Sequence, residues 1–246
     1  MRRVRFLHRH VAILGASFPL APLLLAGLTL AATIAGAAGS RNGVRWILAL
    51  GVLAPDAVLA SGQVWRLLTW TFFEPAPLSL IFAAFTLLFF GRDLCNSWGP
   101  EKFLLRCLGL VALTGVVSCL IARFVWVELW DGAWYSAWPL GESIIIAWAT
   151  QYPMSQVLVY FVLPVGGQRL VILTIAGTLL FAALSGFSGY VPHFVAQGLT
   201  LAWLYGVSPR TLWLRLKVRT VRWTPRRAQS RLRPVERPSE PPRWLH

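Results

Sequence analysis

The sequence predicts an all-α fold, a polytopic bundle that crosses a lipid bilayer six times. Of the 246 residues, 57% are hydrophobic and only 13% are charged, which leaves less polar surface than a soluble domain of this length requires. The 13 tryptophans support this interpretation, because indole rings favour the interface between lipid and water. Six apolar windows define the expected helices: about 11–37, 77–91, 103–124, 140–152, 167–186 and 190–207.

The windows differ in length. A crossing helix needs about 20 apolar residues, so 77–91 and 140–152 can cross only if they lie within the bundle or are extended by their neighbours. The window at 11–37 is longer than the apolar core of a usual signal peptide and lacks a convincing cleavage pattern. We therefore interpret it as the first membrane helix.

The net charge of +14 is concentrated at the two ends of the chain. Residues 208–246 contain eleven Arg or Lys and two Glu, and residues 1–10 contain four Arg. The positive-inside rule then predicts that both termini are cytoplasmic, around a transmembrane domain at 11–207. We expect the Arg- and Pro-rich tail to contact an anionic leaflet, and no specific nucleic-acid binding is predicted.

The cysteines show no spacing typical of a metal site. Cys95, Cys107 and Cys119 are far apart along the chain, and the last two lie twelve residues apart on one expected helix. The sequence therefore predicts three free thiols, no metal ligands and no cofactor.

Four stretches, taken in order, resemble the rhomboid superfamily. They are "GQVWRLLTWTFFEP" (Gly62–Pro75), "FAAFTLLFFGRDLCNSWGPEKFL" (Phe82–Leu104), "QYPMSQVLVYFVLPVGGQRL" (Gln151–Leu170) and "VPHFVAQGLTLAWLYG" (Val191–Gly206). The resemblance implies a rhomboid-like bundle of six helices with a water-accessible cavity. Active members of this superfamily are intramembrane serine proteases, in which a Ser on the fourth helix is activated by a His on the sixth.

The resemblance places the two catalytic positions at Ser143 and His193. Such a site needs a base within hydrogen-bond reach of the hydroxyl, and donors where negative charge develops. His193 is the one histidine in the expected bundle. An ionisable residue inside the membrane is costly and usually marks a functional site, so a functional role is expected for His193. A histidine that merely bonds a neighbouring helix is the alternative.

The sequence around Ser143 departs from the family motif Gly-x-Ser-Gly. Ile144 replaces the second Gly and would crowd the backbone beside the oxyanion. Family members commonly place about fifteen residues between the nucleophile and the proline that ends the segment, but Ser143 precedes Pro153 by ten. Counting back fifteen gives Trp138, and the other nearby hydroxyl, Ser136, lacks the motif.

The oxyanion region is also incomplete. The family often carries His-x-x-x-Asn before the Gly that ends the second helix, and counting back from Gly91 gives Ser79 and Ala83. Ser79 and Gly141 are then the remaining candidates for this region. The loss of one oxyanion donor typically lowers the rate roughly 100- to 1000-fold.

Four further residues have expected structural roles. Trp65 and Arg66 suit a loop that is anchored in the headgroups and bonds backbone carbonyls. Glu142 suits a helix N-terminus, where the dipole favours a carboxylate, and Glu74 is expected to be a polar group of the outer loop.

The leading hypothesis is a degenerate rhomboid-like protein that binds transmembrane segments of clients, or lipids, without cutting them. The first alternative is an active intramembrane serine protease with Ser143 as nucleophile and His193 as base. A transporter or channel is a weaker alternative, because it needs paired intramembrane charges, and Glu142 and His193 are the candidates.

Overall fold

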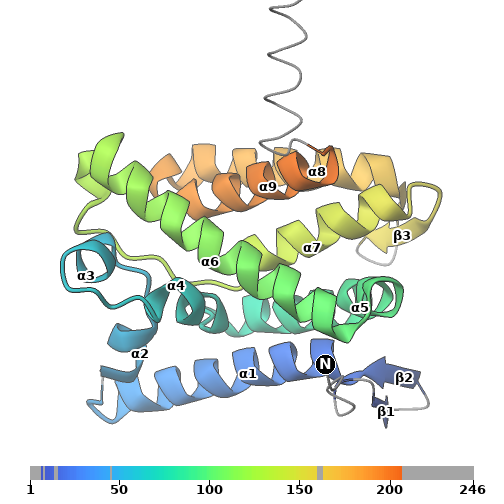
Figure 1. Ribbon diagram of the computed structural model, residues 1–246, viewed down its shortest axis with the longest axis horizontal. Helices are drawn as coiled ribbons and strands as arrows, with labels where there is room; N and C mark the ends of the chain where they lie inside the picture. Colours follow the sequence, from blue (N-terminus) through green and yellow to red (C-terminus); the bar gives the residue numbers. More distant parts are fainter. Residues whose placement is uncertain (1–6, 8, 14–15, 45, 160–162, 207–246) are drawn as a thin grey trace, which may run out of the picture. The chain divides into compact units, whose positions relative to one another are not determined.

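The chain is mostly helical in the computed structural model, which describes residues 7, 9–13, 16–44, 46–159 and 163–206 (Figure 1). The described helices are α1 (Leu20–Arg41), α2 (Trp46–Gly51), α3 (Pro55–Leu59), α4 (Arg66–Thr69), α5 (Pro77–Trp98), α6 (Pro100–Phe124), α7 (Trp138–Gln151), α8 (Gly167–Ser185) and α9 (Val191–Leu204). Short 3-10 segments occur at Trp70–Phe72, Val127–Leu129 and Phe187–Tyr190.

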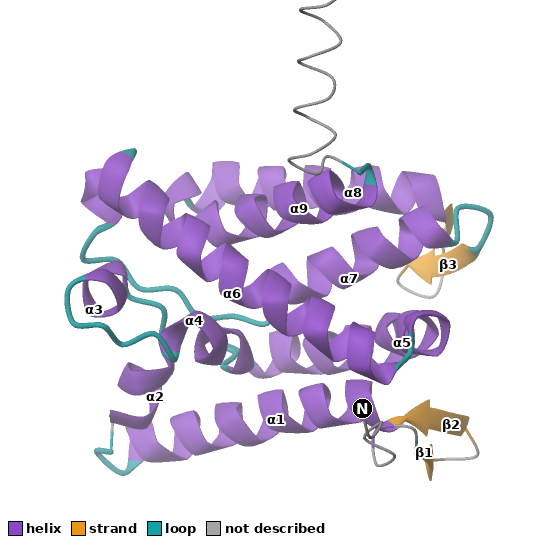
Figure 2. Cartoon of the chain, viewed as in Figure 1, coloured by secondary structure: helices purple, strands orange, loops and turns teal. Residues whose placement is uncertain are grey.

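Two antiparallel hairpins correct the all-α prediction (Figure 2). β1 (His10–Ile13) pairs with β2 (Ala16–Pro19), so the first helix begins at Leu20 and not near residue 11. β3 (Gln156–Val159) pairs with β4 (Leu163–Gly166) between α7 and α8. The expected helix at 11–37 overlapped β1 and β2, because short apolar runs fit either structure, whereas β3 and β4 lie in the stretch expected to link two helices.

Four helices, α1, α5, α6 and α8, are long and apolar enough to cross a membrane among the described residues. α7 and α9 have 14 residues each, so each is about 21 Å long against a hydrocarbon core of about 30 Å. The mostly helical, multi-span architecture is confirmed, and the count of six crossings stays a prediction.

α7 is the central helix of the unit Met1–Tyr205, which contains nearly all of the described residues. It packs against α5, α8 and α9, and Figure 1 shows it between α5 and the α8–α9 pair, with α6 running across it. Large apolar side chains are exposed on the outer helices, as expected where the solvent is lipid. On α5 and α8 they include Ile81, Phe85, Phe89, Leu173, Leu180 and Phe181.

The turn between α5 and α6 is a single residue, Gly99. Its φ of +84° is unfavourable for a residue with a Cβ, and Pro100 follows at the first position of α6. The turn therefore lets α6 begin directly after α5 in a new direction.

The segment between α1 and α5 folds onto the bundle. Leu53 and Trp134 exchange two backbone hydrogen bonds of 2.8 and 2.9 Å, which join this segment to the connection before α7. Trp70, Phe72 and Phe73 are buried, although the sequence places them in a loop.

The three cysteines are free thiols, as predicted, and the structure buries all three. The predicted tail at 208–246 and most of the basic segment at 1–10 lie outside the described residues.

Candidate membrane-embedded polar site

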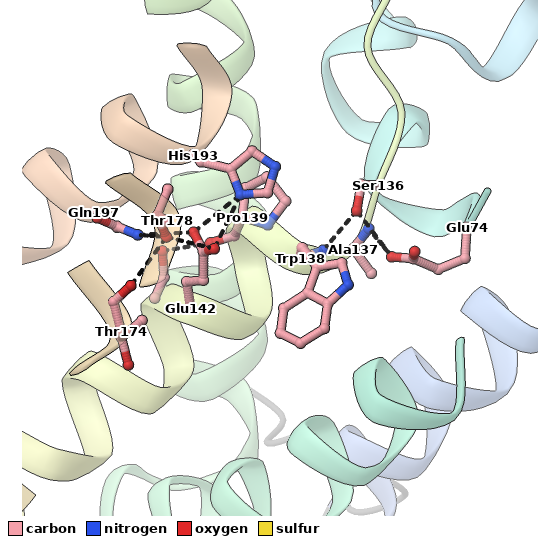
Figure 3. Close-up of polar contacts among 11 residues, drawn as sticks. Glu74, Ser136, Ala137, Trp138, Pro139, Glu142, Thr174, Thr178, His193 and Gln197 are labelled. Atoms are coloured by element: carbon pink, nitrogen blue, oxygen red, sulfur yellow. Dashed lines mark hydrogen bonds and ion pairs between the residues drawn. The ribbon is translucent and has the colours of Figure 1, made fainter. Parts of the chain in front are cut away.

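Glu142 is the centre of a buried polar cluster formed by α7, α8 and α9. It is the fifth residue of α7 and is 8% exposed. Its carboxylate faces Thr178 on α8 and both His193 and Gln197 on α9, as Figure 3 shows. We call these four residues the Glu142 cluster.

The donors of Thr178, His193 and Gln197 that face Glu142 all have an acceptor. Oε1 of Glu142 accepts from Thr178 Oγ1 at 2.9 Å and from His193 Nδ1 at 3.1 Å. Oε2 accepts from Gln197 Nε2 at 3.0 Å, and the same amide donates a second hydrogen to Thr178 Oγ1 at 2.7 Å. The polar groups that face Glu142 are therefore paired, which is the condition under which a buried polar group is stable, and Thr178 Oγ1 also reaches the carbonyl of Thr174 at 3.1 Å.

The expected capping role of Glu142 is wrong. Its side chain bonds α8 and α9 and makes no hydrogen bond to the start of its own helix. The carboxylate at that helix start is Glu74, which is 7% exposed. Glu74 Oε1 accepts from the backbone N–H of Ala137 at 2.5 Å and from Ser136 Oγ at 3.1 Å, so a residue expected in the outer loop serves the N-terminus of α7 (Figure 3).

Ser143 is buried at 2% exposure, and its hydroxyl is engaged within its own helix. Ser143 Oγ donates to the carbonyl of Pro139 at 2.8 Å. His193 makes its side-chain hydrogen bonds to Glu142, and the described residues include no bond between His193 and Ser143. The two positions that a protease would join thus have separate partners.

The predicted oxyanion residues lie on two helices. Ser79, on α5, donates its hydroxyl hydrogen to the carbonyl of Ala76 at 2.7 Å. A Cβ added to Gly141 would lie 3.6 Å from Thr86, which places Gly141 where α7 packs on α5. A Cβ added to Gly91 would lie 3.2 Å from the ring of Phe103 on α6, so Gly91 permits close packing of α5 on α6.

Arg66 is buried at 8% exposure, whereas Trp65 beside it is 48% exposed. Arg66 donates from Nη1 to the carbonyls of Ala49 and Val52 and from Nε to Gln63 at 2.7 Å. The guanidinium thereby holds the segment before α5 in place.

Replacing Arg66 with Lys is expected to destabilise the fold by about 1–2 kcal/mol. An ammonium group cannot reproduce the fork that reaches two carbonyls and a side-chain amide together. The midpoint of unfolding in an SDS titration would measure the loss, with Arg41→Lys at the exposed end of α1 as the matched control. Equal midpoints for both variants would contradict the role of Arg66.

Thr178 and Gln197 are the residues that sequence reasoning missed. Gln197 follows His193 by four positions on one helix, so both side chains lie on the same face. A polar pair at this spacing in an apolar helix was a usable signal for Gln197. Thr178 gave no such signal, because the hydroxyl of a threonine in a helix readily donates to a backbone carbonyl of the preceding turn.

Comparison with known protein families supports the prediction of a membrane protein. A family model described as "Eukaryotic integral membrane protein (DUF1751)" matches residues 22–206, which is three quarters of the chain. No curated protein matches the sequence closely enough to count as a relative. The matched range includes all four residues of the Glu142 cluster.

Proposed function

We propose a function from the premise that the chain belongs to the eukaryotic integral membrane protein family DUF1751. We propose that the protein is a member of the rhomboid superfamily that does not cut peptide bonds. Instead, it binds transmembrane segments of client proteins, or lipids. The observation that carries this proposal is the separation of partners: Ser143 bonds Pro139, whereas His193 bonds Glu142.

The chemistry of acyl transfer supports the proposal. A serine becomes a nucleophile when a base accepts its proton, and this requires a hydrogen bond between the two side chains. Here the proton of Ser143 Oγ points to a backbone carbonyl of α7, which cannot act as a base. Ile144 beside it and Ser79 in place of an amide donor further weaken an oxyanion site.

A fluorophosphonate probe applied to purified protein in lipid nanodiscs tests the proposal. We expect no labelling above background, and the same signal for wild type, Ser143→Ala and His193→Ala. A known intramembrane serine protease, treated in parallel, would show that the probe enters the bilayer. Ser136→Ala serves as the matched control for the nearby hydroxyl.

Labelling of the wild type that disappears in both Ser143→Ala and His193→Ala would overturn the proposal. Cleavage of a single-pass model substrate that is lost in the same two variants would do so independently.

An active protease is the second candidate, and one observation favours it. Glu142 holds Nδ1 of His193, which is how a carboxylate orients a catalytic imidazole and leaves Nε2 as the base. This arrangement needs a nucleophile at Nε2, so Ser143 would have to exchange its bond to Pro139 for one to His193.

A further inference from the structure

An apolar groove opens between α6, α7 and α9, apart from the Glu142 cluster. Its volume is about 270 Å³. The α6 wall contains Arg106, Gly109, Leu110 and Leu113, which recur at helical spacing along one face. Ser143 lines the opposite wall on α7.

The polar groups inside the groove are already satisfied. Ser143 Oγ donates to Pro139, and Thr200 Oγ1 on α9 donates to the carbonyl of Ala196 at 2.7 Å. Neither hydroxyl hydrogen remains for a ligand. The interior therefore suits hydrocarbon and not a polar molecule.

One end of the groove is cationic. Arg106 lies over the rings of Trp98 and Trp203, with 4.5 and 4.8 Å between its guanidinium carbon and the ring centroids. Trp98 is the last residue of α5 and Trp203 is near the end of α9, so the ends of these two helices meet α6 at Arg106. Arg106 is exposed, and no ion pair joins it to an acidic side chain of the described residues.

The spacing along α6 fits a lipid. Arg106 is the seventh residue of α6, and Leu113 lies seven residues further along. This separation corresponds to about 10 Å of helix, so the groove extends inward from a cation that is flanked by two tryptophans. Tryptophan and arginine are typical of the headgroup level of a bilayer.

We propose that this groove holds an acyl chain of one anionic phospholipid, with the lipid phosphate on Arg106. The inference rests on the proposed function and narrows it to a lipid class. A transmembrane helix is about 10–12 Å across and would need several times this volume over the same length. Charge complementarity selects an anionic headgroup, because Arg106 is the ionised group of the lining.

Gly109 provides a direct test of the groove. A Cβ at Gly109 would meet no atom within 4 Å, so the side chain of Gly109→Leu starts in open space and can extend into the groove. Gly27→Leu on α1 is the matched control, because Gly27 is also an exposed helical glycine with nothing within 4 Å.

The experiment is native mass spectrometry of the full chain in detergent, with palmitoyl-oleoyl phosphatidylserine or phosphatidylcholine added. We expect wild type and Gly27→Leu to retain one phosphatidylserine in preference to phosphatidylcholine. Arg106→Gln should lower that preference about fivefold, whereas Arg106→Lys should keep most of it. Gly109→Leu should lower the retention of both lipids about tenfold, because the acyl chain loses its apolar contacts.

Equal retention of phosphatidylserine by wild type and Gly109→Leu would overturn the proposal and would assign the lipid to another surface, such as the basic tail. Glycerophosphoserine that competes as well as the intact lipid would also overturn it, because the acyl chain would then contribute nothing. Displacement of the lipid by a transmembrane peptide, with wild-type affinity for that peptide in Arg106→Gln, would assign the groove to a protein partner. None of these outcomes depends on proteolysis, so they are distinct from a positive fluorophosphonate result.

Discussion

Replacing Glu142 with alanine is expected to destabilise the protein by about 3 kcal/mol. The substitution removes the acceptor that Thr178, His193 and Gln197 share, although Thr178 can still donate to the carbonyl of Thr174. Thr178 and Gln197 keep their bond to each other, so His193 is the residue left without a partner. Reversible unfolding in an SDS titration, followed by tryptophan fluorescence, would measure the change.

Ser143→Ala is the matched control for Glu142→Ala. Ser143 is the next residue of α7 and is also buried, but its hydroxyl bonds its own helix, so the change should be below about 1 kcal/mol. A double-mutant cycle between Glu142→Ala and His193→Ala should give a coupling of about 1–2 kcal/mol, with the double variant less destabilised than the sum. Strictly additive losses would show that the 3.1 Å contact contributes nothing.

Gly167→Ala is expected to be as damaging, at about 3 kcal/mol. A Cβ at this first residue of α8 would lie 2.6 Å from the carbonyl oxygen of Ala149, 2.7 Å from that of Tyr152 and 3.0 Å from the Cα of Pro153. All three atoms belong to backbone at the end of α7, so no side chain can rotate to make room. The α7–α8 contact would have to open, which also displaces Thr178 from Glu142.

Gly166→Ala separates this steric effect from a general effect of glycine replacement. Gly166 has φ −71° and ψ 154°, which alanine adopts freely, and a Cβ there would meet nothing within 4 Å. The change should be below about 1 kcal/mol. Thermal unfolding and the monodisperse yield in detergent would compare the two variants, and a Gly167→Ala protein as stable as Gly166→Ala would disprove the close approach.

The candidate site was only partly predictable from the sequence. His193 stood out because an ionisable residue in an apolar helix is rare, and the structure places it, half-buried, against the carboxylate of Glu142. The pairing with Glu142 was considered only for a transporter, because residues 51 positions apart give no local sign of contact. The preference for a capping role failed because the dipole argument considers one helix, whereas α8 and α9 provide three donors on the same side of α7.

The groove, too, could not be predicted from the sequence alone. Arg106, Trp98 and Trp203 are unremarkable along the chain, since interfacial Trp and Arg occur throughout membrane proteins. They meet because Gly99 reverses the chain between α5 and α6, and because α9 packs along α6. No periodicity in the sequence predicts that meeting.

The sequence by itself determined the class of protein: its apolar windows require a lipid-embedded helical architecture, because that composition cannot form a water-soluble surface. It also predicted windows that overlap α5 to α9, although α5 ends at Trp98 and Gly91 lies within this helix instead of ending it. The tertiary structure decided which polar groups face one another: Glu142 bonds His193, and Glu74 bonds the backbone at the start of α7. The physical reason is that hydrophobic burial follows from local composition, whereas hydrogen-bond partners in a bundle depend on how distant helices pack.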